Sequence, residues 1–360
     1  MDNPNTYKMI GLMSGTSGDG LDIAYCEFVF DGKWHYSIPT FETVGFPEKL
    51  AKKLRKSHKL SGYKLSLLDV AFGKWMGEQV RSFVQKNKIQ VNAVASHGHT
   101  VFHQPEKGIS LQIGNGWALH RYSGIPVIND FRMLDVQLGG QGAPLVPIGD
   151  RLLFSEYDYC INLGGIANIS MESAGLRIAF DICPFNLLLN YFSEYRGLAF
   201  DKNGELARSG RLLPGVFKSL NKISYYDIEG AKSLGREDLI DFMEILEGED
   251  EYKVENILHT LVMHFVEQIK RSMKPIPSKK ASVLVTGGGA FNTFFMEKLE
   301  EALNQEFEII PANPTIINYK EALIFAFLGV LKLRKENNCL SSVTGASKDN
   351  CGGTVFGMEN

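Results

Sequence analysis

The sequence predicts an α/β protein built from two related domains, and three observations support this prediction. The length of 360 residues suits two domains of ordinary size. Apolar runs that end in glycine turns alternate along the chain with segments of helical periodicity, which is typical of α/β proteins. A strand, a glycine turn and a second strand occur at residues 10–23 and again at 161–169. Each half therefore begins with the same hairpin device.

In the first half, residues 7–13 and 21–30 are apolar runs on either side of a glycine-rich turn, which predicts a β-hairpin. A third run follows the turn at Asp31-Gly32. Apolar residues then recur at intervals of three and four over residues 65–84, which predicts a long helix. A short strand is expected over residues 93–95.

In the second half, the same reasoning predicts strands at 159–163, 168–171, 178–181 and 282–286. Helices are expected from Pro184 onward, since proline suits a first helical turn, and over residues 254–269, 292–303 and 319–334. Strands and helices thus alternate to the end of the chain.

Composition and charge exclude several classes of protein. The 38 basic and 41 acidic residues give a net charge of −3, so no general positive field is available for nucleic acid or an anionic membrane. Residues 1–5 are polar and lack the pattern of a signal peptide, and no apolar stretch reaches membrane-spanning length. Five scattered cysteines predict neither a disulfide framework nor a structural zinc site. We expect a cytoplasmic protein.

Glycine is the unusual component, because 36 of the 360 residues are glycine, against about 7% in average proteins. Three glycine turns follow predicted strands, at residues 15–20, 164–165 and 287–289. Such turns expose backbone N–H groups to phosphate. The alternative for each turn taken singly is a tight hairpin, but three together favour a nucleotide site. Neither the Walker motif nor the dinucleotide-binding GxGxxG pattern occurs at these positions.

Two carboxylates are candidates for catalysis or structure. Asp181 ends a predicted strand, where α/β sheets place groups that contact ligands, and it could act as a general base. Equally, it could cap the helix that starts near Pro184. Glu321 falls in the first turn of a predicted apolar helix, where the helix dipole favours a negative charge.

The histidines of Ser96-His97-Gly98-His99-Thr100 are a weak indication of metal. In a strand, His97 and His99 would share one face, but the sequence supplies no further ligands nearby, so polar residues lining a pocket are the better interpretation. Arg132 could grip a substrate carboxylate with two hydrogen bonds or pair with a neighbouring aspartate. No nucleophile-elbow motif supports a serine hydrolase.

Gly11-Leu12-Met13-Ser14-Gly15-Thr16-Ser17-Gly18-Asp19-Gly20-Leu21-Asp22 closely resembles the opening signature of the anhydro-N-acetylmuramic acid kinases. The resemblance continues in order along essentially the whole chain. Its further matches are Ser96-His97-Gly98, Gln112-Ile113-Gly114, Asn129-Asp130-Phe131-Arg132, the glycine-rich segment 139–147, segment 162–168, Gly287-Gly288-Gly289-Ala290, Glu321-Ala322-Leu323 and Thr344-Gly345-Ala346.

The resemblance implies the fold of the sugar kinase, heat-shock ATPase and actin superfamily, with two ribonuclease H-like α/β domains flanking a nucleotide cleft. We expect residues 1–133 with 341–360 to form the first domain and residues 134–340 the second. The implied reaction is the ATP-dependent phosphorylation of 1,6-anhydro-N-acetylmuramic acid with hydrolytic opening of its anhydro ring, which gives N-acetylmuramate 6-phosphate and ADP in cell-wall recycling. A homodimer follows from the habit of the family.

The resemblance also implies roles for individual residues. Asp181 is the general base, Mg²⁺ is held through water by Asp19 and Asp22, and the sugar is contacted by His97, Arg132, Asn186 and Glu321. ATP is bound by the glycine turns, whose residues are Gly15, Thr16, Ser17, Gly18, Asp19, Gly20, Leu21, Asp22, Gly164, Gly165, Gly287, Gly288 and Gly289.

The departures from the family pattern concentrate beside Asp181. The family usually reads Asp-Thr-Gly-Pro-Gly-Asn there, whereas this chain has Asp181-Ile182-Cys183-Pro184-Phe185-Asn186. His99 replaces a usual glutamine, and Gly149-Asp150 stands where a histidine is usual. Bulk from Cys183 and Phe185 beside the sugar suggests, as alternatives, a kinase for another amino or anhydro sugar, or an inactive nucleotide-binding regulator.

Overall fold

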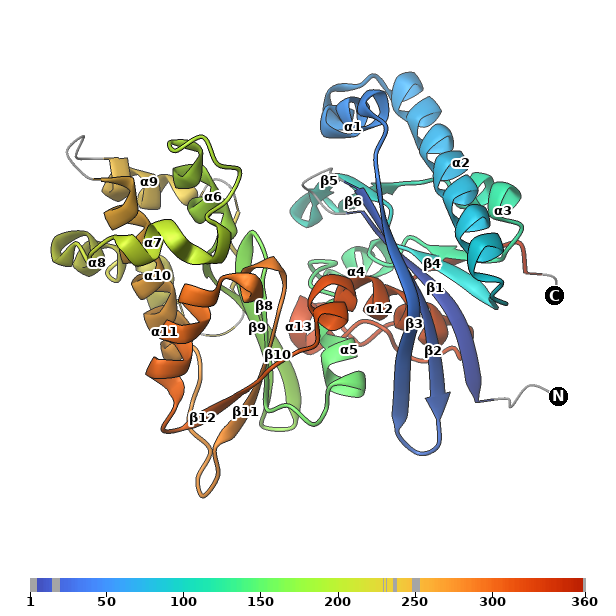
Figure 1. The fold of residues 1–360 in the computed structure, drawn as a ribbon. Coiled ribbons are helices and arrows are strands. Elements are labelled where there is room, and N and C mark those ends of the chain that lie inside the picture. The colour runs from blue at the N-terminus through green and yellow to red at the C-terminus, as the bar shows by residue number, and fades with distance from the viewer. Residues whose placement is uncertain are drawn as a thin grey trace. The chain divides into compact units, whose positions relative to one another are not determined.

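The computed structural model describes residues 5–14, 20–228, 230, 232–235, 238–247 and 253–358. The chain forms two compact units, one of Met1–Leu153 with Tyr319–Asn360 and one of Phe154–Asn318. Each unit contains a central β-sheet with helices, which confirms the predicted α/β class (Figure 1). Residues 15–19, the centre of the first predicted glycine turn, lie outside the described part.

Unit 1 is organised around a six-stranded sheet in the order β13-β7-β4-β1-β2-β3, with a separate two-stranded sheet β5-β6. The strands are β1 (Thr6–Ser14), β2 (Gly20–Phe30), β3 (Trp34–Gly45), β4 (Ala93–Ser96), β5 (His99–Gln104), β6 (Ile109–Ile113), β7 (Val127–Asn129) and β13 (Thr354–Phe356). The α-helices are α1 (Glu48–Arg55), α2 (Gly62–Asn87), α3 (Gly116–Ser123), α4 (Met133–Gln137), α5 (Val146–Leu153), α12 (Pro314–Leu333, in this unit from Tyr319) and α13 (Ser341–Thr344).

Unit 2 is organised around a five-stranded sheet in the order β10-β9-β8-β11-β12. The strands are β8 (Tyr159–Leu163), β9 (Ile166–Ser173), β10 (Leu176–Pro184), β11 (Ala281–Thr286) and β12 (Phe307–Ile310). The α-helices are α6 (Asn186–Glu194), α7 (Glu205–Ser209), α8 (Pro214–Leu220), α9 (Leu239–Glu247), α10 (Val254–Arg271) and α11 (Thr293–Leu303).

The two sheets share one strand plan. In each, the first three strands form an antiparallel meander, and the first strand also pairs in parallel with a fourth, which pairs in parallel with a fifth. The order β3-β2-β1-β4-β7 in unit 1 thus corresponds to β10-β9-β8-β11-β12 in unit 2. The repeated hairpin seen in the sequence is therefore the opening of a repeated sheet.

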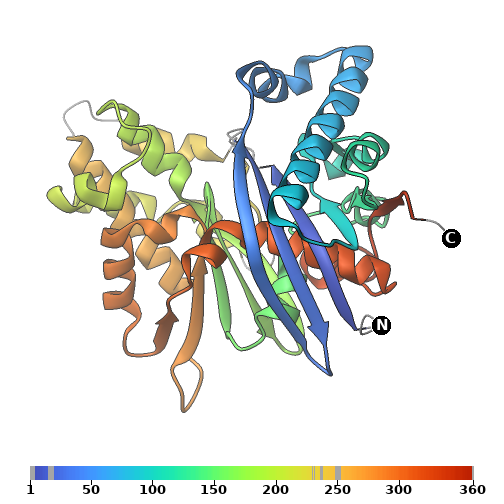
Figure 2. The same ribbon diagram turned by 45° about the vertical axis from the view of Figure 1, so that its right-hand side comes forward.

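Helices cover both faces of the sheet in unit 1, with α2 and α3 on one side and α12 on the other (Figures 1 and 2). Successive side chains of β1 point to opposite faces of the sheet, and Ile10 and Leu12 pack in the core between the sheet and α2. Between them, Gly11 faces α12, where a Cβ atom would lie 1.8 Å from the carbonyl oxygen of Ala322. Because only glycine permits this approach, part of the glycine excess serves helix packing and not ligand binding.

The domain boundaries differ from the expected ones, because residues 134–153 and 319–340 belong to unit 1. The physical reason is the packing of α5 against α12. A Cβ atom on Gly149 would lie 2.6 Å from Ile324 Cγ1, and Lys320 forms an ion pair with Asp150. The C-terminal segment also belongs to unit 1, as expected, and β13 pairs with β7.

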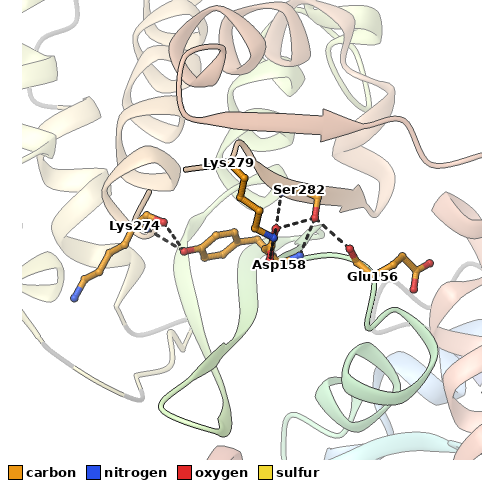
Figure 3. Close-up of polar contacts among 6 residues, drawn as sticks. Glu156, Asp158, Lys274, Lys279 and Ser282 are labelled. Carbon is orange, nitrogen blue, oxygen red and sulfur yellow. Dashed lines mark hydrogen bonds and ion pairs between the residues drawn. The ribbon is translucent and has the colours of Figure 1, made fainter. Parts of the chain in front are cut away.

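The start of β8 in unit 2 is fixed to β11 by a polar cluster around Asp158 (Figure 3). Lys279 Nζ lies 2.8 Å from both Asp158 carboxylate oxygens, and the Ser282 amide donates to Oδ2 over 2.9 Å. Burial raises the pKa of Asp158, but these contacts together outweigh burial and leave the pKa below its ordinary value. The cluster fixes the register that brings Asn162 opposite Thr286 at the other end of the two strands.

Candidate active site

Two predicted glycine turns lie together in unit 2. Gly164-Gly165 follows β8 and Gly287 follows β11, and these strands are parallel neighbours, so both turns lie at the same sheet edge. Gly287 has φ +83°, and a Cβ atom there would lie 2.6 Å from Asn162 Oδ1. Only glycine suits this conformation and this contact. The tertiary structure thus brings the two turns to one place.

A cavity of about 480 Å³ opens beside the third turn, within unit 2. Its walls come from α6, from residues 200–203 and from residues 288–292, including Gly288 and Gly289. Asn186, expected to contact the sugar, lies in this wall. Phe200 and Phe291 also line it and are 58% and 44% exposed, so two aromatic rings are available to a ligand. Sequence reasoning missed these two aromatic residues.

Asp181 is half-buried in β10, the edge strand of the sheet, next to an irregularity in strand register between Asp181 and Cys183. The Leu234 amide donates to Asp181 Oδ2 over 2.9 Å. Burial raises the pKa of Asp181, and the hydrogen bond from Leu234 opposes this effect. The residue at the N-cap of α6 is Phe185, so the interpretation of Asp181 as a helix cap is wrong.

Cys183 and Phe185 do not add bulk to a substrate pocket, which corrects the expectation from sequence. Both side chains are fully buried in the core of unit 2. The Phe185 ring packs at 4.7 Å between centroids on Phe295, and a Cβ atom on Gly289 would lie 2.4 Å from its edge. Phe185 therefore packs directly against the third glycine turn at Gly289, and the neighbouring Ile182 is buried in the same core.

In unit 1, the described end of the first predicted phosphate turn is Gly20-Leu21-Asp22 at the start of β2. Asp22 is half-buried, and its Oδ1 accepts a hydrogen bond from Thr43 Oγ1 over 2.6 Å. Thr43 Oγ1 also lies 2.9 Å from the Tyr319 hydroxyl. Burial raises the pKa of Asp22, and the bond from Thr43 lowers it. The rest of this turn, residues 15–19, is outside the described ranges.

Glu321 does not lie in the first turn of its helix, because α12 begins at Pro314. The helix dipole therefore gives no reason for a carboxylate there. Burial raises the pKa of Glu321, the positive charge of Arg132 lowers it, and the negative charge of Asp22 raises it further. Electrostatic coupling thus links Asp22, Arg132 and Glu321 in unit 1.

His97 holds the Arg132 side chain in place through a hydrogen bond. Its Nδ1 lies 2.9 Å from the Gly98 carbonyl oxygen, which can only accept, so Nδ1 carries the proton and Nε2 is free to accept. Arg132 Nη2 lies 2.9 Å from Nε2. Burial lowers the pKa of His97 to about 3, so the ring stays neutral. Arg132 is held further by the Gly142 carbonyl oxygen and, although burial lowers its pKa to about 10, remains cationic at neutral pH.

His97 and His99 are not on one strand face, because Gly98, with φ +73°, turns the chain between β4 and β5. His99 Nδ1 lies 3.5 Å from Ser14 Oγ, and His103 Nδ1 lies 3.0 Å from Ser110 Oγ. Among the described residues, no group of three or more histidine, cysteine, aspartate or glutamate side chains is arranged to hold a metal.

The Thr344-Gly345-Ala346 motif is explained by Asp135, which is fully buried. Asp135 Oδ1 accepts hydrogen bonds from Thr344 Oγ1 over 2.9 Å and from Asn350 Nδ2 over 2.8 Å. Its Oδ2 accepts the Gly142 amide over 2.8 Å. Asp135 thus joins the glycine-rich segment 139–147 to the C-terminal segment, and through Gly142 it supports Arg132.

The chain is similar to known proteins over nearly its whole length. The family model of anhydro-N-acetylmuramic acid kinase matches residues 7–358. The chain belongs to this family. Among curated relatives, the anhydro-N-acetylmuramic acid kinase of Acinetobacter baylyi is 32% identical over 97% of this chain and 99% of its own length. That of Sulfurimonas denitrificans is 31% identical over 96% of this chain and 98% of its own length.

More distant similarity extends to solved structures. The activator of the 2-hydroxyisocaproyl-CoA dehydratase from Clostridium difficile has a TM-score of 0.43 and 13% identity, and covers 91% of this chain and 97% of its own. The ROK hexokinase from Thermus thermophilus has a TM-score of 0.37 and 15% identity, and covers 90% and 99%. The family predicted from the motifs, and with it membership of a kinase family, is confirmed by the family model and the curated relatives.

Proposed function

We propose that this chain phosphorylates 1,6-anhydro-N-acetylmuramic acid with ATP and opens the anhydro ring with water, giving N-acetylmuramate 6-phosphate and ADP during cell-wall recycling. The observation that carries this proposal is the half-buried Asp181 carboxylate in β10, in a chain that matches the family over residues 7–358.

In this reaction Asp181 acts as the general base. A water O–H bond breaks, the proton goes to Asp181, and the water oxygen bonds to the anomeric carbon. The bond between that carbon and the bridging oxygen breaks, the bridging oxygen takes the γ-phosphoryl group, and ADP leaves. Because burial raises the pKa of Asp181, this carboxylate is a stronger base than an exposed aspartate.

For the nucleotide, we propose that the described residues Gly20, Leu21 and Asp22 and the turn Gly164-Gly165 contact the phosphates, together with residues 15–19. The nucleoside occupies the cavity beside Gly287–Gly289. The exposed rings of Phe200 and Phe291 support this assignment, because nucleobases stack on aromatic side chains. Asn186 lines the same cavity, so we assign it to the nucleotide and not to the sugar.

For the sugar, we propose Arg132 and Glu321 as contacts. The fixed guanidinium of Arg132 suits the carboxylate of a muramic acid, which it can bind through two parallel hydrogen bonds. His97 is nearly fully buried and already bonded to Arg132, so we assign it the support of Arg132 in place of direct contact.

Magnesium fits the residues at Asp22. The family implies this ion, which prefers oxygen ligands and keeps most of its waters, so one or two carboxylates with substrate phosphates suffice. Asp22 offers a half-buried carboxylate, and its negative charge raises the pKa of Glu321, so the two carboxylates interact. We propose that Asp22, with Asp19, holds Mg²⁺ through water; when bound, the ion neutralises charge on the transferred phosphoryl group.

Purified protein with ATP and the anhydro sugar should yield ADP and a ring-opened, phosphorylated product by mass spectrometry. In ¹⁸O-labelled water, the label should enter the hydroxyl on the anomeric carbon. Asp181→Asn should lower kcat by orders of magnitude while ATP binding by calorimetry is kept. Phosphorylation of other sugars alone would contradict the substrate, and near-normal turnover of Asp181→Asn would remove Asp181 as the base.

Two alternatives lose support. The substitutions that suggested a different sugar, Cys183 and Phe185, are buried in the core and cannot reshape a sugar pocket directly. An inactive regulator is disfavoured by the retention of Asp22, Asp181 and Glu321. Tight ATP binding without turnover across a sugar panel would restore it.

We further propose a cytoplasmic location, supported by the need for ATP, and a homodimer, supported by the habit of the family alone. Among the helices in the described ranges, none combines the length and the apolar character that crossing a membrane requires. Fractionation of cells and light scattering of the purified protein test these two points.

A further inference from the structure

Two described segments of unit 2, residues 224–228 and 232–235, contact the outer edge of β10 at Asp181, and we name these two segments together the strap. β10 is an edge strand, so its outward backbone groups lack a neighbouring strand. At Asp181 the strap supplies the partners. The Asp181 amide donates to the Lys232 carbonyl oxygen over 3.0 Å, and the Tyr225 hydroxyl donates to the Asp181 carbonyl oxygen over 2.7 Å.

The strap also holds the Asp181 side chain. The Leu234 amide donates to Oδ2 over 2.9 Å, whereas no described residue donates to Oδ1. A proton on Oδ2 would weaken the bond from the Leu234 amide, since that oxygen accepts best while it carries negative charge. Oδ1 is therefore the oxygen that can accept a proton without disturbing the strap.

Tyr225 holds the strap against β10 through its hydroxyl group. Lys232 Nζ donates to the Tyr225 carbonyl oxygen over 3.1 Å and lies 4.7 Å from the centre of the Tyr225 ring. Burial, and then the negative charge of Asp181, raise the pKa of the Tyr225 hydroxyl, so it stays a protonated donor. Loss of this donor would free the Asp181 carbonyl while the ring could stay under Lys232.

We propose that Tyr225 is a positioning residue for Asp181, and that the strap directs Asp181 Oδ1 to the water that opens the ring. This inference rests on the proposed role of Asp181 as general base. It adds two points to that role. Oδ1 is the carboxylate oxygen that takes the proton, and Tyr225, which does not react itself, keeps Oδ1 in place. A general base must lie within hydrogen-bond distance of its water, so a small displacement of Oδ1 slows the reaction.

The test compares two tyrosines that are neighbours in the strap. Tyr225→Phe removes the hydroxyl bonded to Asp181, while Tyr226→Phe removes a hydroxyl that lies 2.8 Å from His264 Nε2. We expect Tyr225→Phe to lower kcat about 10-fold with KM for ATP unchanged, because one hydrogen bond that positions a catalytic group is lost. Tyr226→Phe should keep kcat within about 2-fold. Unchanged kcat in Tyr225→Phe, or equal losses in both variants, would overturn the proposal.

Two further measurements separate this inference from the proposed function. If the wild-type protein phosphorylates another sugar, the same comparison on that sugar tests the strap although the substrate proposal has failed. If it phosphorylates none, the ¹³C resonance of the Asp181 carboxyl, assigned with Asp181→Asn, should titrate differently in Tyr225→Phe but not in Tyr226→Phe. A crystal structure with the anhydro sugar and a non-hydrolysable ATP analogue should place a water on Oδ1; a water on Oδ2 contradicts the inference.

Discussion

Lys320 Nζ lies 2.7 Å from Asp150 Oδ1, and both side chains are 5% exposed. This buried ion pair joins α12 to α5 inside unit 1. Its cation, Lys320, directly precedes Glu321 in the sequence. Gly149-Asp150 stands where the pattern of the family usually has a histidine. The pair therefore fixes the position of the helix that carries Glu321.

Removal of one partner of this pair should destabilise unit 1 strongly. Lys320→Met takes a cation from beside a buried carboxylate, and we expect a loss of about 3–5 kcal/mol in the free energy of unfolding. The double variant Lys320→Met/Asp150→Leu should recover most of it, because apolar residues can replace a buried pair. Urea unfolding of Lys320→Met, of Asp150→Leu and of the double variant measures this; a loss in the double variant equal to the sum of the two single losses would contradict the expected coupling.

Phe185→Gly restores the usual family residue at this position, and we expect it to affect stability and not the choice of sugar. Phe185 is fully buried against Phe295, so the cavity should cost about 4 kcal/mol or more. Unfolding experiments test the first part. The ratio of kcat/KM values for the anhydro sugar and for N-acetylglucosamine tests the second, and a large change in that ratio would show that Phe185 does act on the sugar.

Gly288→Ala should weaken nucleotide binding without loss of stability. A Cβ atom at Gly288 meets no described atom within 4 Å, and the residue lines the cavity, so the methyl group would occupy space that we assign to the nucleoside. We expect about 10-fold weaker binding of ADP by calorimetry. The matched control is Gly215→Ala in α8, where a Cβ atom also meets nothing within 4 Å. Equal ADP affinity in both variants would argue against this location for the nucleoside.

Buried histidines should make the protein less stable below neutral pH. Burial lowers the pKa of His264 to about 3, and its ring lies between Tyr226 and Asn221. Between pH 6.5 and 3 the unfolded chain binds a proton at this histidine that the folded chain does not. The free energy of unfolding therefore has its full value above pH 6.5 and decreases as the pH falls. His97 acts in the same direction.

The measurement is the free energy of unfolding from pH 7.5 to pH 5, with His264→Gln as the comparison. The variant should lose stability at pH 7.5, because the two hydrogen bonds of the ring are disturbed. Its stability should also fall less steeply with decreasing pH. A slope equal to that of the wild-type protein would mean that His264 is not the group responsible.

The sequence by itself determined the class of the protein, the repeated hairpin and the family, because these depend on local patterns. The period of apolar residues over 65–84 and 254–269 predicted α2 and α10, and strand periodicity with a glycine boundary placed β8 at 159–163. Asp181 and the glycine turns were found in the same way, by residue type at the end of a strand.

The tertiary structure alone decided what depends on contacts between distant residues. Gly149 against Ile324 assigns residues 134–153 to unit 1, and the start of α12 at Pro314 takes Glu321 out of the first helical turn. Burial of Cys183 and Phe185 moves two suspected sugar residues into the core. The strap is similarly invisible in the sequence, because Leu234 holds the Asp181 carboxylate through a backbone amide, and the Tyr225 hydroxyl bonds to the backbone carbonyl of Asp181. Every residue has these backbone groups, so residue type alone does not reveal the contacts.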